Sequence, residues 1–184
     1  MPNMKKYLIT AIILGSIAMG SGLLIGATNL VTSGPIAAYE QTQINEGIKG
    51  IFDNPEYQNV HYGKEEDVEK SDDNKYVDHV YYVYSGTNEN DENNTFIGWA
   101  FKTEGSNNYG KVALIIGFDN QAVYKDLSIV KNEQSFASTL KKKYINEVKS
   151  GERQIADVSC GATFGAKLVR DMIKNAQDVA DSMK

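Results

Sequence analysis

The sequence has few side chains that bind metals or form cross-links. It contains one cysteine, Cys160, and two histidines, His61 and His79. A single cysteine excludes an intrachain disulfide. Together the three side chains leave little material for a zinc or iron–sulfur site, so proteins built on such centres are not favoured.

The sequence also lacks an excess of positive charge. Nineteen basic residues stand against 24 acidic ones, which gives a net charge of −5. Binding to phosphate backbones needs clustered lysine and arginine, so this balance argues against a nucleic-acid partner. Hydrophobic residues make up 41% of the chain, close to the usual globular fraction, and a packed core is expected.

Charged residues are absent from a long segment near the N-terminus, residues 7–39. Its apolar part, residues 7–31, exceeds the roughly 20 residues that a helix needs to cross a bilayer. Lys5 and Lys6 precede it, so the positive-inside tendency places residues 1–6 in the cytoplasm. We therefore expect a single-pass anchor in the cell membrane and an extracytoplasmic domain formed by residues 32–184.

A cleaved signal peptide is the competing interpretation of this segment. The apolar region of a signal peptide usually has about 7–15 residues, and the run here is longer. Ile-Ala-Ala at residues 36–38 would be a poor cleavage site. An uncleaved anchor is therefore favoured.

The first element expected after the span is a helix that runs on from the membrane segment. Thr32 and Pro35 have the character of a cap and a first-turn proline, so they predict its start. Asn54-Pro55 predicts its end. Four apolar residues recur between them at helical spacing and predict one buried stripe: Ile44, Ile48, Ile51 and Phe52.

Strands follow in the middle of the chain. Residues 63–74 are mostly charged and predict a solvated loop, while residues 87–94 and 105–110 predict connecting loops. Asp119-Asn120 predicts a tight hairpin, because both residues tolerate positive φ. Runs rich in valine, tyrosine or other apolar residues predict four strands: residues 75–85, 95–101, 111–118 and 122–130.

Two helices are expected at the end of the chain. The first repeats apolar residues every four positions and stops at Ser150-Gly151: Phe136, Leu140, Tyr144 and Val148. The second also carries an apolar stripe: Phe164, Leu168, Met172, Ile173, Ala176 and Val179. Strands followed by helices predict an α+β domain, an antiparallel sheet packed with helices, preceded by one transmembrane helix.

The segment most informative about chemistry is residues 157–167, at the start of the last helix. The first turn of a helix has free N–H groups and a positive dipole end, which stabilise a phosphate without any lysine. Gly161 and Ala162 keep bulk away from that approach, and Thr163 offers a hydroxyl at the same point. A phosphate could sit beside this hydroxyl or be esterified to it. The simpler alternative is that Ser159 or Thr163 caps the helix.

The pattern Asp157-x-x-Cys160-Gly161-Ala162-Thr163 resembles the flavinylation motif of the FMN-binding domain family, Asp-x-x-(Ser/Thr)-Gly-Ala-Thr. This family includes the G subunit of the Rnf ferredoxin–NAD oxidoreductase and the C subunit of the sodium-translocating NADH–quinone oxidoreductase. In the family a flavin transferase links the FMN phosphate to the threonine of Gly-Ala-Thr. The resemblance therefore implies covalent FMN on Thr163 and a flavin transferase as a partner during maturation.

The resemblance extends to the order of the elements over nearly all 184 residues. The likeness includes the membrane helix, a helix like residues 44–52, a strand like residues 98–102 and a glycine hairpin unit at residues 109–119. It implies a membrane-anchored flavoprotein electron carrier that works with other membrane subunits of an Rnf-type ion-translocating complex. The implied cofactor-binding residues are Thr163, Ala162, Gly161, Cys160, Ser159, Asp157, Glu133 and Gly110.

The sequence departs from the family at two places. Cys160 stands where the family has serine or threonine, and a thiol is a weaker hydrogen-bond donor than a hydroxyl; the adjacent Ser159 is a substitute. The family often has a Glu-Thr-Pro-Gly-Leu-Gly loop against the flavin ring. Here residues 133–137 read Glu-Gln-Ser-Phe-Ala, and Glu133 corresponds to the family glutamate.

Other functions remain open from the sequence. A flavin-free binding or structural module of the same fold is one, and a stand-alone flavinylated protein in an extracellular electron-transfer chain is another. A cysteine-dependent enzyme would use Cys160 at the helix start, with His61 or His79 as base. Lys111 and Lys167 lie in segments expected near the cofactor, where either could pair with a phosphate, although a solvated charge is the simpler interpretation.

Overall fold

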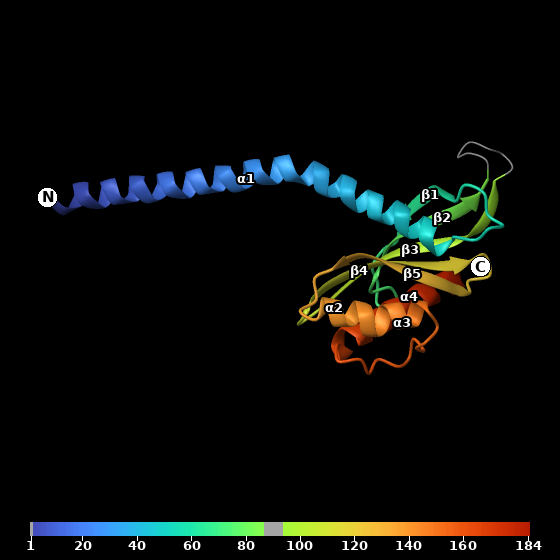
Figure 1. Cartoon of the computed structure of the whole chain (residues 1–184). Helices are drawn as coiled ribbons and strands as arrows, with labels where there is room; N and C mark the ends of the chain where they lie inside the picture. The colour runs from blue at the N-terminus through green and yellow to red at the C-terminus, as the bar shows by residue number, and fades with distance from the viewer. Residues whose placement is uncertain (1, 87–93) are drawn as a thin grey trace. The chain divides into compact units, whose positions relative to one another are not determined.

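A computed structural model describes residues 2–86 and 94–184. The expected loop at residues 87–94 therefore lies outside the described residues except for Asn94. The chain forms two compact units, Met1–Thr42 and Gln43–Lys184. Figure 1 shows the order of the elements along the chain, from the N-terminal helix through the strands to the C-terminal helix.

The N-terminal helix α1 spans Pro2–Ile51, and its segment Lys6–Ile51 is long and apolar enough to cross a membrane. The predicted helix start at Thr32 and Pro35 is wrong, because α1 continues through both residues. The Thr32 hydroxyl donates to the carbonyl oxygen of Thr28, 2.9 Å away, instead of capping a new helix. An interior proline costs one backbone hydrogen bond, but Pro35 does not end α1.

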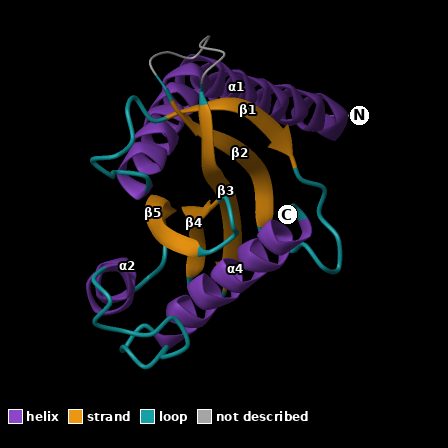
Figure 2. Cartoon of the chain, turned by 90° about the vertical axis from the view of Figure 1, so that its right-hand side faces the viewer, coloured by secondary structure: helices purple, strands orange, loops and turns teal. Residues whose placement is uncertain are grey.

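The sheet has five antiparallel strands, each paired with its neighbours in chain order, β1-β2-β3-β4-β5. The predicted α+β class with an antiparallel sheet is confirmed, and Figure 2 shows the strands and helices by colour. The strands are β1 (His61–Asp67), β2 (Val77–Ser85), β3 (Thr95–Asn107), β4 (Gly110–Asp119) and β5 (Tyr124–Asn132).

Strand β1 was not expected, and the predicted loop at residues 63–74 is wrong for its first part. Residues such as Glu65 and Glu66 pair with Tyr81 and Val80 of β2. Because β1 is an edge strand, its charged side chains can stay in water while its backbone pairs on one side only. Charge therefore did not exclude a strand here.

Two connections also differ from the prediction. Strand β3 runs to Asn107 and β4 begins at Gly110, so the expected loop at residues 105–110 shrinks to a short turn. The turn after Asp119 is longer than two residues: Asp119 accepts the N–H groups of Gln121 and Val123 on one carboxylate oxygen, both at 2.9 Å. Positive φ occurs at Ala122, at 55°, and not at Asp119 or Asn120.

A helical segment follows β5 and is built from three short pieces. These are α2 (Ala137–Leu140), a π-helical turn η1 (Lys141–Ile145) and α3 (Asn146–Lys149). The segment stops at Ser150, and Gly151 follows with φ of 75°, so the predicted stop is confirmed. The last helix, α4, spans Thr163–Ser182.

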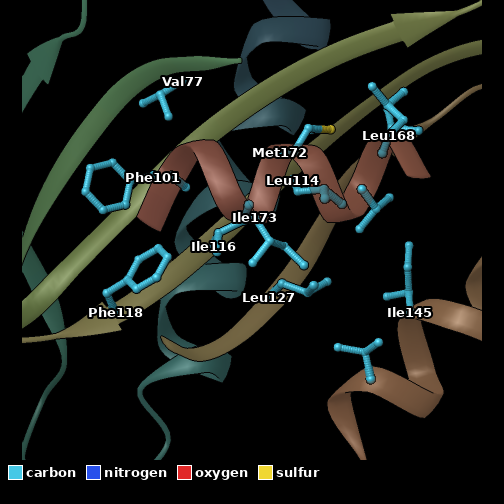
Figure 3. Packing of buried hydrophobic residues seen from close by; sticks show 14 of the residues in the cluster. Val77, Phe101, Leu114, Ile116, Phe118, Leu127, Ile145, Leu168, Met172 and Ile173 are labelled. Atoms are coloured by element: carbon cyan, nitrogen blue, oxygen red, sulfur yellow. The ribbon is translucent and has the colours of Figure 1, made fainter. Parts of the chain in front are cut away.

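Both faces of the sheet are covered. On one face the end of α1 buries its predicted stripe: Ile44, Ile48, Ile51 and Phe52 are 1–6% exposed and pack with Tyr81 and Ile115. On the other face, α4 and the α2–α3 segment cover the larger core, as Figures 2 and 3 show. That core includes Phe101, Leu114, Ile116, Met172 and Ile173. The sheet and the two helical layers together fix the position of the start of α4.

Candidate functional site

The start of α4 has no side-chain cap. Thr163 is its first residue, and Ala162 precedes it with φ −119° and ψ 42°. The cap expected from Ser159 or Thr163 is therefore not present. No acidic residue lies in the first turn, and Gly161 adopts a left-handed φ of 76° that favours glycine. The positive end of the helix dipole thus has no carboxylate of its own turn to neutralise it.

A cavity of about 240 Å³ lies at this helix start. Three segments that are distant in sequence form its walls: the β3–β4 hairpin, the segment between β5 and η1, and the first turn of α4. Figure 2 shows α2 beside one end of α4. The lining residues are Tyr109, Gln134, Phe136, Leu140, Gly161, Ala162, Thr163, Phe164 and Gly165.

Three exposed aromatic rings gather on this cavity. Tyr109 and Phe164 stack with ring centroids 5.3 Å apart, and Tyr109 lies 6.2 Å from Phe136. Phe164 is 60% exposed and Phe136 is 54% exposed, whereas the helical period grouped them with apolar residues such as Leu140 and Leu168, which are buried. A cluster of exposed aromatic residues is typical of a binding surface.

Two buried or half-buried amides hold the walls together. The Asn107 amide donates to the carbonyl oxygen of Phe164 at 3.2 Å, and its oxygen accepts the N–H of Tyr109 at 2.8 Å. Gln134, 6% exposed, donates to Asn107 at 3.1 Å and to the carbonyl oxygen of Gly110. Neither amide was predicted, because the contacts that join the walls reach residues far away in the chain.

The backbones of Gly110 and Glu133 approach each other closely beside Gln134, which lines the cavity. Gly110 has φ of 127°, and a Cβ there would lie 2.2 Å from the carbonyl oxygen of Glu133. The Glu133 carboxylate pairs with Lys131 at 2.9 Å, and Glu133 is not among the lining residues. The glycine therefore permits β4 to approach the segment that carries Gln134.

Asp157 and Ser159 belong to an ion-paired loop that leads into the motif. Arg153 is its centre: the guanidinium lies 2.8 Å from the Glu147 carboxylate and 2.7 Å from that of Asp157. It also donates to the carbonyl oxygen of Ser159 at 3.3 Å, and Asp157 accepts the N–H of Ser159 at 3.2 Å. The acidic residue of the motif thus positions the loop, and its partner Arg153 was not found from the sequence.

Replacing Arg153 with alanine is expected to lower the free energy of unfolding, because it removes the charge-assisted hydrogen bonds that the guanidinium makes to Glu147 and Asp157. Denaturant unfolding followed by fluorescence of Trp99, the single tryptophan, measures this. The control is Arg170→Ala, which removes only the ion pair with the adjacent Asp171. Equal losses in the two variants would contradict the role of Arg153.

Cys160 is half-buried and packs against the larger core. Nearby, the Tyr144 hydroxyl donates to the carbonyl oxygen of Ile155 at 2.6 Å. Burial raises the pKa of Tyr144 to about 12, so the hydroxyl remains protonated and keeps this bond. The tyrosine fixes the loop upstream of the motif.

The two histidines are engaged within the sheet. His79 lies 2.6 Å from the Asp67 carboxylate, and His61 bonds to the carbonyl oxygen of Asn59 at 2.8 Å and contacts Asn94 at 3.2 Å. These contacts give no support to a histidine base for Cys160. Over residues 2–86 and 94–184, no group of three metal-binding side chains is found.

The two lysines that the sequence placed near the cofactor have different surroundings. The Lys111 ammonium pairs with the Glu104 carboxylate at 2.9 Å, and this hydrogen bond lowers the pKa of Glu104. Lys167 lies over the exposed ring of Phe164, with its nitrogen 5.8 Å from the ring centroid. Only Lys167 is therefore placed at the rim of the cavity.

No protein-family model matches this sequence, and no curated protein matches it. What the site binds must follow from its own geometry. That geometry combines a hydroxyl, an uncapped helix start and an aromatic wall in one small cavity.

Proposed function

We propose that the chain is a membrane-anchored flavoprotein electron carrier that holds FMN as a phosphoester on Thr163. One observation carries this proposal: the cavity at Thr163 joins an uncapped helix start to a cluster of exposed aromatic rings. FMN has these two parts, an anionic phosphate and a planar ring system. The motif resemblance gives the same attachment residue.

The helix start suits the phosphate. The free N–H groups of the first turn favour an anion, and no acidic side chain of that turn competes with it. A Cβ at Gly161 would have its nearest neighbour 3.7 Å away, on Thr139, so the approach is open. Among the residues that the structure describes, none forms a hydrogen bond with the Thr163 hydroxyl, which leaves that oxygen available for esterification.

The aromatic wall suits the ring. Tyr109, Phe136 and Phe164 offer flat apolar faces, and a stacked aromatic contact contributes about 0.5–1.5 kcal/mol beyond its buried area. The cavity of about 240 Å³ is smaller than the roughly 300–1,000 Å³ of pockets that enclose a whole ligand. A covalent bond would retain a cofactor of which such a cavity encloses only a part.

When bound, FMN supplies the redox chemistry, and the protein supplies position and electrostatics. The residues of this chain have separate roles. Thr163 holds the cofactor. Asn107 and Gln134 keep the β3–β4 hairpin, which carries Tyr109, against α4. Asp157 and Arg153 keep the motif loop in place. A ring left partly exposed would be open to electron exchange with partners.

The anchor completes the proposal. Lys5 and Lys6 before the apolar segment support a cytoplasmic N-terminus and a flavin domain outside, where a freely dissociating cofactor would be lost by dilution. The partners would be other membrane subunits of an Rnf-type ion-translocating complex, or the components of an extracellular electron-transfer chain. The apolar segment, residues 7–31, has no ionisable acid or base for ion coupling.

Expression with and without a flavin transferase tests the proposal. With the transferase, the protein should give a fluorescent band on a denaturing gel and a mass raised by esterified FMN. A known substrate of the transferase, expressed alongside, controls for its activity. An unmodified mass next to a labelled control substrate would contradict the proposal and favour a flavin-free module.

Replacing Tyr109 with leucine is expected to raise the fluorescence of the attached flavin. A tyrosine ring in contact with an excited flavin quenches it by electron donation, and among the described residues Tyr109 is the one tyrosine that lines this cavity. The measurement is the flavin fluorescence yield of folded protein at equal labelling. Tyr57→Leu, at a site away from this cavity, is the control. An unchanged yield in the Tyr109 variant would place the ring elsewhere.

A further inference from the structure

Three consecutive lysines follow directly in the chain after the segment that lines the cavity. Lys141, Lys142 and Lys143 are all exposed and follow directly after Leu140, which lines the cavity. Together with the exposed rings of Tyr109, Phe136 and Phe164, they form what we term the aromatic–lysine face.

A π-helical turn presents these lysines. The three lysines are flanked by buried residues. Leu140, just before η1, and Tyr144 and Ile145, at the end of η1, are 0–1% exposed. The wider π turn brings two adjacent residues, Tyr144 and Ile145, into the core, which leaves the three intervening lysines on the outer side. Such turns are rare in helices and frequent at functional sites.

The lysine charges are not neutralised locally. Other lysines of this region pair with acids, as Lys131 does with Glu133 and Lys149 with Asp126. Within the described part of the chain, Lys141, Lys142 and Lys143 form no ion pair. Three exposed ammonium groups therefore remain available to a partner.

The segment that carries the face also differs in sequence charge from the rest of the domain. Residues 131–174 hold nine basic and five acidic side chains, a net charge of +4. The remainder of residues 32–184 holds eight basic and 19 acidic side chains, a net charge of −11. An acidic partner would be repelled by most of the domain and attracted to this segment.

We propose that the aromatic–lysine face docks an acidic electron-transfer protein, with the cavity at Thr163 at the centre of the contact. An apolar aromatic centre with a polar rim is the usual anatomy of a protein interface. Charge complementarity raises the association rate and orients the partner, which suits the small, short-lived interfaces of electron transfer. The redox character of the partner rests on the proposed function, whereas the docking itself does not need the flavin.

Binding of full-length protein without flavin to two probe proteins tests the docking. The probes are cytochrome b5, a small acidic haem protein, and cytochrome c, a small basic one, each titrated at low and high ionic strength. We expect the affinity for cytochrome b5 to be higher at low ionic strength than at high ionic strength, because salt screens the attraction between charges. The triple variant K141Q/K142Q/K143Q should bind it about five- to tenfold more weakly, whereas K141R/K142R/K143R should retain the affinity.

The control K64Q/K70Q/K75Q changes three lysines of the β1–β2 region and should leave the affinity for cytochrome b5 unchanged. An affinity for cytochrome b5 that does not fall in the glutamine variant would overturn the proposal, whereas binding of cytochrome c to the acidic remainder of the domain should be the same in both proteins. A glutamine variant that loses affinity for short-chain phosphatidylglycerol but not for cytochrome b5 would also overturn it, because a lipid would then occupy the face. Covalent flavin on Thr163 is measured separately on denaturing gels. A failure of docking can therefore be distinguished from a failure of the flavin proposal.

Discussion

Replacing Thr163 with alanine is expected to abolish the covalent flavin while the fold persists. Thr163 is the first residue of α4 and lines the cavity, and alanine removes its hydroxyl, the atom to which the phosphate would be linked. Alanine is the best helix former, and the threonine hydroxyl makes no hydrogen bond to a described residue. The free energy of unfolding should therefore change by no more than about 0.5 kcal/mol.

The readout is in-gel flavin fluorescence together with the intact mass after expression with a flavin transferase. Thr139→Ala is the matched control, because Thr139 lies closest to the Cβ position of Gly161 but is not the expected acceptor. It should remain labelled. Persistent labelling of the Thr163 variant would move the attachment to another hydroxyl, such as that of Ser159.

Replacing Gly110 with alanine is expected to destabilise the domain by about 3 kcal/mol or more. The residue has φ of 127°, a region that L-residues rarely adopt, and the new Cβ would stand 2.2 Å from the carbonyl oxygen of Glu133. Backbone strain of this kind costs roughly 1–3 kcal/mol, and overpacking adds a similar amount. The start of β4 would have to move away from the segment that carries Gln134.

The variant Gly151→Ala distinguishes the cost of backbone strain from the cost of steric overlap of the new Cβ. Gly151 also has positive φ, at 75°, but nothing lies within 4 Å of its Cβ position, so its cost should be only about 1 kcal/mol. Denaturant unfolding of both variants, followed by the fluorescence of buried Trp99, gives the comparison. If both variants lost the same stability, close approach at Gly110 would not be what the glycine provides.

Much of the fold could be predicted because the decisive signals are local. The spacing of Ile44, Ile48 and Ile51 marks a helix face, and runs of valine and tyrosine mark β2. Elements whose stability depends on context were missed or misplaced. Strand β1 is highly charged and is held by its pairing with β2, while α1 continues through Pro35, which has the sequence character of a helix start.

The candidate site divides in the same way. Residues 157–163 are contiguous, so a motif could place Gly161, Ala162 and Thr163 at a helix start. The aromatic wall joins Tyr109 to Phe164 across 55 positions of the chain. Pairings of that range, and the amides that fix them, depend on how the sheet and α4 pack, and no local pattern specifies them.

The same packing accounts for the exposure of Phe136 and Phe164. Each stands at the N-terminal boundary of a helical segment, where the apolar period continues but the core does not. Periodicity predicts which side of a helix is apolar, but it does not show where the opposing surface ends. Their exposure turns two apparent core residues into part of the wall of the cavity.

The central claim is tested most directly by mass spectrometry of the protein isolated from its own membranes. Intact mass should show one esterified FMN, and peptide mapping should place it on Thr163 within the peptide that contains Gly161 and Ala162. An unmodified intact mass, or a flavin attached to any other residue, would contradict the account.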